Sequence, residues 1–232
     1  DNNIQYKAKT GALGHTIVVG FDYRYLSDNN SVGLGTAPSL DLFNPKYGGL
    51  SVTDPAFYTA TPQNMHQEGV YFQDQMKWKG LNITLSGRQD WADLQTKNRL
   101  SGTTTNSSSE KFTWRAGILY EFSQGVAPYF SYATSFYPTT GTDFEGKAFK
   151  PTTGDQYELG VKYKPKNIDA LFTVAAFNLT QKNVLTTDPD ATHVGYQVQT
   201  GAIRSRGVEA EAHVWLNKNL NLITSFTHLD EV

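Results

Sequence analysis

The stretch that decides the fold runs from Leu81 to Trp91 and reads LNITLSGRQDW. Leu81, Ile83, Leu85 and Trp91 fall on one parity, and polar residues such as Arg88 fall on the other. Successive side chains of a β-strand point to opposite faces, so this segment has one apolar and one polar face. We therefore predict a β-strand with its apolar face covered and its polar face in contact with water.

Three further segments repeat this two-residue period. Their apolar members are Ile17, Val19, Phe21, Tyr23 and Tyr25; Phe112, Trp114, Ala116, Ile118 and Tyr120; and Tyr157, Leu159, Val161 and Tyr163. No segment shows a sustained helical period, and no apolar run reaches the roughly 18 residues of a membrane-spanning helix. The chain is predicted to be all-β.

The connections between these strands are of two kinds. Short turns are expected at 11–14, 79–80, 123–125, 165–167 and 217–219, and long polar stretches at 27–66, 92–110, 139–154 and 181–199. The two kinds alternate strictly along the chain. Soluble β-sandwiches usually keep their loops short, whereas outer-membrane barrels combine short periplasmic turns with long extracellular loops. The pattern predicts a transmembrane antiparallel meander β-barrel, here an incomplete segment of about ten strands.

Composition narrows the function further. The formal net charge of -2 argues against nucleic acid as a partner, and the absence of cysteine excludes disulfides and thiolate metal sites. The chain opens on Asp1-Asn2-Asn3 without a signal peptide, so we expect either a cleaved leader or an incomplete chain. No nucleophile elbow or phosphate-binding loop is present, and no enzymatic activity is expected.

Aromatic residues make up 13% of the chain, and they cluster near the predicted strand ends. Amphipathic rings favour the level of the lipid headgroups. We expect two girdles, an outer one with Trp91, Phe112 and Trp114 and a periplasmic one with Trp78, Tyr120, Phe122 and Tyr163. The alternative is that these rings form the core of a soluble barrel.

Five segments carry a resemblance to a known family. They read GVYFQDQ (69–75), GRQDWAD (87–93), GVAPYFSYATSFYP (125–138), KPTTGDQYELGVKY (150–163) and GAIRSRGVEAEA (201–212). In this order they resemble strand signatures of TonB-dependent receptors, and among these the ferrichrome (hydroxamate siderophore) receptors. The resemblance covers most of the chain.

The resemblance implies ferric siderophore uptake across the bacterial outer membrane, driven by the TonB complex. Family members have a barrel of twenty-two strands filled by a plug domain, so residues 1–232 would be a partial barrel domain without plug or terminal strands. The implied partners are a ferric siderophore, the TonB complex through the absent plug region, membrane lipid and lipopolysaccharide. No cofactor is implied, since iron enters only within the bound siderophore. The alternative is a passive porin or substrate-specific channel.

The strand near the C-terminus indicates which face is the lumen. Glu209, Glu211 and His213 share one parity, and a carboxylate facing lipid is costly, so this face is expected to line the lumen. A metal site is not expected there, because residues two apart on a strand lie about 7 Å from one another. Arg204 and Arg206 share the outward parity near the extracellular end. They are candidates to contact lipopolysaccharide phosphates; simple solvation, or a bulge at Gly207, is the alternative.

The same argument sorts the other strands. We expect the convex, lipid-facing set to include Ile17, Val19, Phe21, Leu81, Ile83, Leu85, Ile118, Leu159, Val161 and Val208. We expect the concave set to include Asp22, Arg24, Thr84, Arg88, Arg115, Glu158, Lys162, Glu209 and Glu211. A register slip of one residue would exchange the two sets.

The long first loop supplies the candidate ligand contacts, namely Phe43, Tyr47, Phe57 and Tyr58. By resemblance, aromatic side chains on the outer side contact a hydroxamate siderophore, whose ferric complex is bulky and carries little charge. Rings offer a large contact area at a small cost in rotamer entropy. The alternative is that these rings only pack the loop against itself.

Overall fold

The structure, a computed structural model, describes residues 1–47, 53–199 and 201–231. Within these ranges the chain forms twelve β-strands, and no described segment is a helix long and apolar enough to cross a membrane. The strands are β1 (Asn2–Thr10), β2 (Leu13–Gly33), β3 (Phe57–Trp78), β4 (Leu81–Lys97), β5 (Thr104–Tyr120), β6 (Val126–Tyr137), β7 (Thr152–Tyr163), β8 (Ala170–Lys182), β9 (Leu185–Thr187), β10 (Gln197–Gln199), β11 (Ala202–Asn217) and β12 (Leu220–Glu231).

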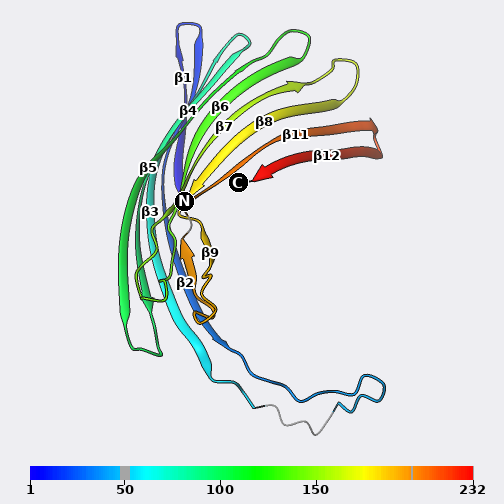
Figure 1. Ribbon diagram of the computed structural model, residues 1–232. Coiled ribbons are helices and arrows are strands. Elements are labelled where there is room, and N and C mark those ends of the chain that lie inside the picture. The colour runs from blue at the N-terminus through cyan, green and yellow to red at the C-terminus, as the bar shows by residue number, and fades with distance from the viewer. Residues whose placement is uncertain (48–52, 200, 232) are drawn as a thin grey trace.

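Ten of these strands form one antiparallel sheet in the order β1-β2-β3-β4-β5-β6-β7-β8-β11-β12. Strands β9 and β10 pair only with each other and form a separate hairpin between β8 and β11. The sheet curves into an open trough, and the short β9–β10 hairpin lies on its concave side (Figure 1). The predicted antiparallel meander of about ten strands is therefore confirmed.

The register places the two predicted residue sets on opposite faces. Ile83 lies opposite Ile118, which in turn lies opposite Phe130, and the row continues through Leu159 to Val208. The next parity carries Thr84, Gly117, Ser131 and Glu158 in one row. Directly paired residues of a sheet share a face. The charged parity is the concave one, because Thr61 and Gln63 on it line a cavity with the turn of the β9–β10 hairpin.

One pair departs from the apolar pattern of the convex face. His15 and Asp74 fall in register with Met76 and Ile17, and His15 Nδ1 lies 2.7 Å from Asp74 Oδ2. Both side chains are mostly covered, at 15% and 14% exposed. Nothing in the sequence predicted this contact, because its partners lie 59 residues apart and each alone looks like an exception to the alternation.

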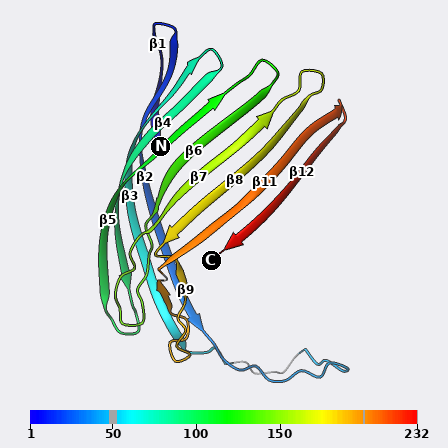
Figure 2. The ribbon, with the colours of Figure 1, turned by 45° about the horizontal axis from the view of Figure 1, so that its top comes forward.

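Strands β2 to β5 are much longer than a membrane requires. They contain 17 to 22 residues, whereas about 9–11 suffice to cross the hydrocarbon core. They run past the long-loop ends of their neighbours, as the views in Figures 1 and 2 show. The expected loop 27–66 shortens to 34–56, and 92–110 shortens to 98–103. Those boundaries were wrong because strands keep their ladder hydrogen bonds where the apolar alternation ends.

The strict alternation of short and long connections is also wrong in one place. The connection 98–103 is no longer than the turn 164–169 at the opposite end of the sheet. The segment 181–199, expected to be irregular, contains the β9–β10 hairpin. Successive connections lie at opposite ends of the sheet, because each strand runs antiparallel to the one before it. Their lengths do not have to alternate.

Aromatic rings form contacts on the convex face at two levels. Trp114, Tyr132 and Tyr157 contact one another across β5, β6 and β7 as tilted pairs, with ring centroids 4.7 and 4.6 Å apart. Tyr120 and Phe122 meet at 4.8 Å near the short turns. The seven rings predicted for the two girdles are between 41% and 58% exposed, which agrees with side chains that face a surrounding medium.

Candidate ligand-binding surface of the lumen and loops

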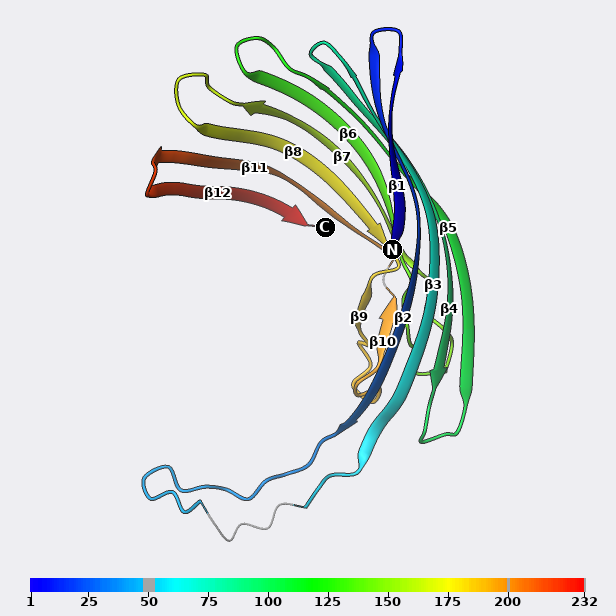
Figure 3. The same ribbon diagram turned by 180° about the vertical axis from the view of Figure 1, so that it is seen from behind.

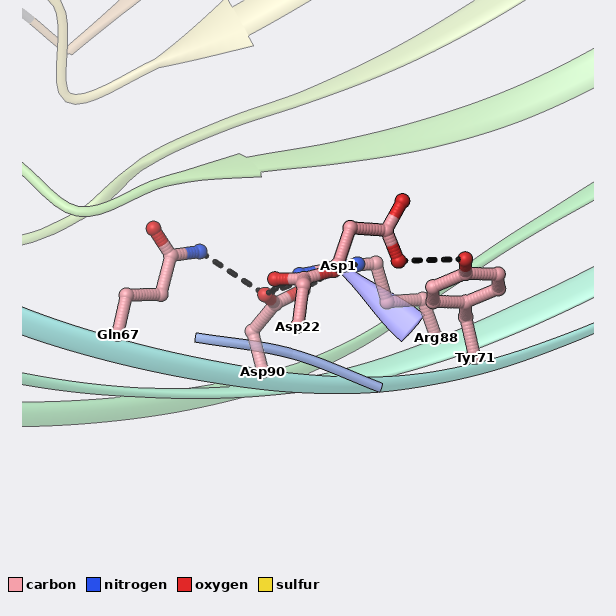
Figure 4. A network of polar contacts seen from close by, with 6 residues as sticks. All are labelled: Asp1, Asp22, Gln67, Tyr71, Arg88 and Asp90. Atoms are coloured by element: carbon pink, nitrogen blue, oxygen red, sulfur yellow. Dashed lines mark hydrogen bonds and ion pairs between the residues drawn. The ribbon is translucent and has the colours of Figure 1, made fainter. Parts of the chain in front are cut away.

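A charged cluster lies on the concave wall where β2, β3 and β4 run side by side (Figure 4). Arg88 reaches Asp22 through Nη1–Oδ2 at 2.6 Å and Nη2–Oδ1 at 3.0 Å, and it also donates to Asp90. Gln67 donates to the same Asp90 carboxylate at 2.9 Å. One guanidinium thus pairs with two carboxylates, so these three side chains together carry one net negative charge.

Two glycines make room for this arrangement. Gly69 lies between Asp22 and Asp90 in the register, and a Cβ there would collide with the Arg88 guanidinium. The Tyr71 ring likewise covers Gly20 and lies 5.8 Å from the centre of the Arg88 guanidinium. The missing side chains let long polar groups lie flat across the wall.

A second polar cluster lies nearer the short turns. Tyr129 Oη donates to Glu158 Oε1 at 2.7 Å, and Gln156 donates to the other oxygen at 3.1 Å. Lys162 lies 5.3 Å from the Tyr129 ring centroid. Tyr129, Glu158 and Lys162, together with Arg115, line a recess of about 410 Å³ on the concave face. The predicted polar lining of the lumen is confirmed here.

At the opposite end, the loop 138–151 and the segment 183–201 are tied together. Gln199 donates to the Lys150 carbonyl at 2.6 Å and accepts from the Lys150 N–H at 2.9 Å. It also donates to the Asn183 carbonyl, and Asn183 donates to the Pro151 carbonyl at 2.9 Å. The side-chain amide of Gln199 therefore links two loops that are not paired in the sheet.

Aromatic and charged groups complete this contact. The Phe144 ring stacks on His193 with centroids 3.6 Å apart, and it meets Tyr196 edge-on. His193 Nδ1 lies 2.8 Å from Asp188 Oδ2. The Asp190 N–H, and then His193, hold the pKa of the Asp188 carboxyl below its usual value. Hydrogen bonds from Thr192 lower the pKa of Asp190 in the same way.

The two connected loops lie over the long-loop end of the concave wall and border a partly open cavity of about 170 Å³, which we call the loop cavity. Its walls come from β2, β3 and β4 on one side and from 140–149 and 195–197 on the other. Figure 3, a view of the molecule from behind, shows the β9–β10 hairpin beside β2. The lining residues are Asn30, Val32, Tyr58, Thr59, Thr61, Gln63, Thr96, Asn98, Thr140, Gly141, Thr142, Phe149, Gly195, Tyr196 and Gln197.

The four predicted ligand contacts do not come together. Phe43 and Tyr47 lie in the loop 34–56 and are 99% and 84% exposed, so neither ring packs that loop against itself. Phe57 and Tyr58 begin β3 rather than lying in a loop, which corrects the prediction. Tyr58 lines the loop cavity, where its ring lies against Gly195. The sequence missed Tyr196 and Phe149, because only the tertiary fold brings their segments to β3.

Arg204 and Arg206 are exposed on the convex parity of β11, as predicted. Arg206 is paired with Asp230 on β12, with Nη2 2.8 Å from Oδ2. Arg204 makes no ion pair with any residue that the structure describes. The register of β11 runs without a break through Gly207, so the alternative of a bulge there is wrong.

The chain matches one protein family over residues 1–232, described as TonB dependent receptor-like, beta-barrel. It belongs to the TonB-dependent receptors. The ferrichrome outer membrane transporter/phage receptor of Escherichia coli K12 is 39% identical over 242 residues, covering 99% of this chain and 32% of the relative. The ferrioxamine B receptor of Salmonella typhimurium LT2 is 35% identical, with 99% and 32% covered.

Solved structures agree on the fold of this TonB-dependent receptor segment. The ferric-catecholate import receptor Fiu of Escherichia coli K12 superposes with a TM-score of 0.74 at 18% identity, covering 99% of this chain and 37% of that one. The ferric citrate transporter FecA, unliganded, gives 0.73 at 18% identity, with 99% and 34% covered. The chain thus spans about a third of the length of the relatives it matches.

Proposed function

We propose that the receptor containing this chain imports a ferric siderophore, of the hydroxamate type, across the bacterial outer membrane. The observation that carries the proposal is the match along the whole chain to relatives described as ferrichrome and ferrioxamine receptors. Transport draws on the TonB complex, which the receptor engages through its plug region. The protein does no covalent chemistry on its ligand and needs no resident cofactor, since iron travels inside the siderophore.

The exposed rings of Phe43, Tyr47 and Phe57 supply the outer contacts in this proposal, and Tyr58 supplies one nearer the wall. Large rings suit a bulky chelate with little charge, because they bury area without requiring a counter-ion. The high exposure of Phe43 and Tyr47 supports this role, as nothing in the described chain covers them.

The proposal is tested with the full-length receptor and a ferric hydroxamate as ligand. Tyr47→Ala, Phe57→Ala and Tyr58→Ala are each expected to weaken binding by about 1–2 kcal/mol where the ring makes contact. Tyr120→Ala, on the convex face near the short turns, is the matched control and should bind normally. Unchanged affinity in all three variants would exclude these rings from the site.

The alternative of a passive channel is separated by a second measurement. Uptake of the ferric hydroxamate is followed in cells that carry the receptor with or without a functional TonB complex. We expect uptake to stop without TonB. Continued uptake, together with swelling of liposomes that contain the purified protein, would replace the proposal with a porin or substrate-specific channel.

A further inference from the structure

The loop cavity has a chemical character unlike that of the rest of the concave wall. No Asp, Glu, Lys, Arg or His side chain of the described residues lines it. Charged residues do occur in the Arg88 cluster and in the Glu158 cluster of the concave wall. The carboxylate nearest in register, Asp28, lies opposite Gln63 but is not part of the lining. An ion would meet no counter-charge on these walls, so the cavity favours a neutral guest.

The polar groups of the cavity have spare hydrogen-bonding capacity. The side-chain amides of Asn30, Gln63 and Gln197 and the hydroxyl of Thr96 make no hydrogen bond to any described residue. Thr96 is only 6% exposed, and its side chain lines the cavity. Gln63 is half-buried, whereas Asn30 and Gln197 are exposed at the cavity mouth. Buried polar groups such as the Thr96 hydroxyl are normally paired. Amides and hydroxyls that converge on one space therefore point to a guest with several hydroxyl groups, which donate and accept equally well.

The remaining walls are flat and aromatic. Tyr58 lies against Gly195, and Phe149, which is 7% exposed, lies beside Gly141. A Cβ on Gly141 would lie 3.4 Å from Gln63 Nε2, which places that amide beside the aromatic wall. A saturated ring with an apolar C–H face and polar edges can contact the aromatic side chains and the amide and hydroxyl groups at the same time.

Size limits the guest further. Drug-sized ligands occupy sites of about 300–1,000 Å³, whereas this cavity measures about 170 Å³. It has room for about five or six waters at about 30 Å³ each, or for one six-membered ring with its hydroxyl groups. A sugar ring would displace those waters while reproducing most of their hydrogen bonds.

We propose that the loop cavity binds one neutral polyhydroxylated ring, a single hexose unit. Two sources share this chemistry, a free monosaccharide and the terminal hexose of a cell-surface glycan such as lipopolysaccharide. The guest rests between the amides of Gln63 and Gln197 and against the rings of Tyr58 and Phe149. The inference goes beyond siderophore import and does not depend on it.

The experiment uses the full-length receptor in detergent and the methyl glycosides of glucose, galactose and mannose as probes, followed by saturation-transfer NMR. At least one glycoside is expected to bind with a dissociation constant of about 1–10 mM, as its small number of non-hydrogen atoms allows. Gln63→Leu should weaken it about tenfold, because an apolar chain of similar size removes the hydrogen bonds. Gln95→Leu, on the convex parity of β4, is the matched control and should leave binding unchanged.

Heat-modifiable mobility on gels verifies that each variant is folded, and Thr96→Val is a second test should Gln63→Leu fail to fold. A soluble lipopolysaccharide oligosaccharide distinguishes the sources: tighter binding than the glycoside assigns the glycan, and no binding assigns the free sugar. Absence of saturable binding by every glycoside, or equal affinity in wild type and Gln63→Leu, would overturn the proposal. So would a tenfold loss of ferric hydroxamate binding in Gln63→Leu without glycoside binding, since the cavity would then belong to the siderophore site.

Discussion

The Arg88 guanidinium reaches over an entire strand to grip the Asp22 carboxylate, with Nη1–Oδ2 at 2.6 Å and Nη2–Oδ1 at 3.0 Å. Arg88 belongs to β4 and Asp22 to β2, and β3 lies between them. Two parallel N–H···O bonds fix both distance and orientation, which only arginine's planar fork provides. The contact therefore depends on the residue of β3 that lies beneath it, Gly69.

Gly69→Ala is the first prediction. The new methyl group takes the space of the guanidinium and leaves Asp22 and Asp90 without their cation. We expect a loss of about 1–2 kcal/mol in the free energy of unfolding, less than for a fully buried pair because Arg88 is 30% exposed on its side chain. Urea unfolding of the full-length receptor in detergent measures it. Gly117→Ala is the control, since its added Cβ makes only ordinary contacts, the nearest with Ser131 Cβ at 3.7 Å. An equal loss of stability there would contradict this explanation.

Gln199→Ala is predicted to uncouple the loop 138–151 from the 183–201 segment. The variant loses the hydrogen bonds to Lys150 and Asn183, each worth about 0.5–1.5 kcal/mol. The exposed loop then opens more often, and trypsin cleavage after Lys147 should accelerate about tenfold. Gln197→Ala, in the same strand β10, should cleave at the wild-type rate. Equal cleavage rates in the two variants would show that the hydrogen bonds of Gln199 do not hold the loops together.

The third prediction concerns pH. The pKa of Asp188 is lowered in the fold, first by the Asp190 N–H and then by His193. A carboxyl with a depressed pKa stabilises the folded loop above its unfolded pKa of about 3.8, and this contribution disappears as pH falls through the folded value. Amide protection of the β9–β10 hairpin, corrected for intrinsic exchange, should be constant from about pH 7 to 5 and fall below about 4. Asp188→Asn should show the lower protection already at neutral pH; normal protection in that variant would refute the assignment.

The two arginines of β11 are expected to differ in their contribution to lipopolysaccharide binding. Asp230 already neutralises Arg206, whereas Arg204 has no ionic partner among the described residues. Arg204→Ala should therefore lower co-purified lipopolysaccharide phosphate more than Arg206→Ala, and the difference should shrink at high salt. Arg115→Ala, an exposed arginine of the lumen recess, should retain the wild-type amount. If Arg115→Ala lowers the co-purified lipopolysaccharide phosphate as much as Arg204→Ala does, the position of Arg204 on the convex face is not what binds lipopolysaccharide.

The sequence by itself determined the class of fold, the strand faces and the family. Alternation such as that of Ile83 and Leu85 against Thr84 follows from a period of two that every strand obeys, so facing is local information. The ordered motifs from Gly69 to Ala212 extended over enough of the chain to predict the family, which the full-length match confirms.

Only the tertiary structure decided where the loops meet the wall. The partners Gln199 and Lys150 are 49 residues apart, and Gly195 reaches Tyr58 across more than half the chain. Neither contact follows a ladder or a period, because loop ends are placed by the curvature of the whole sheet. The strand ends above the membrane escaped prediction for a related reason: polar residues on both faces of β2 and β3 erase the alternation, while backbone pairing continues to hold the strands.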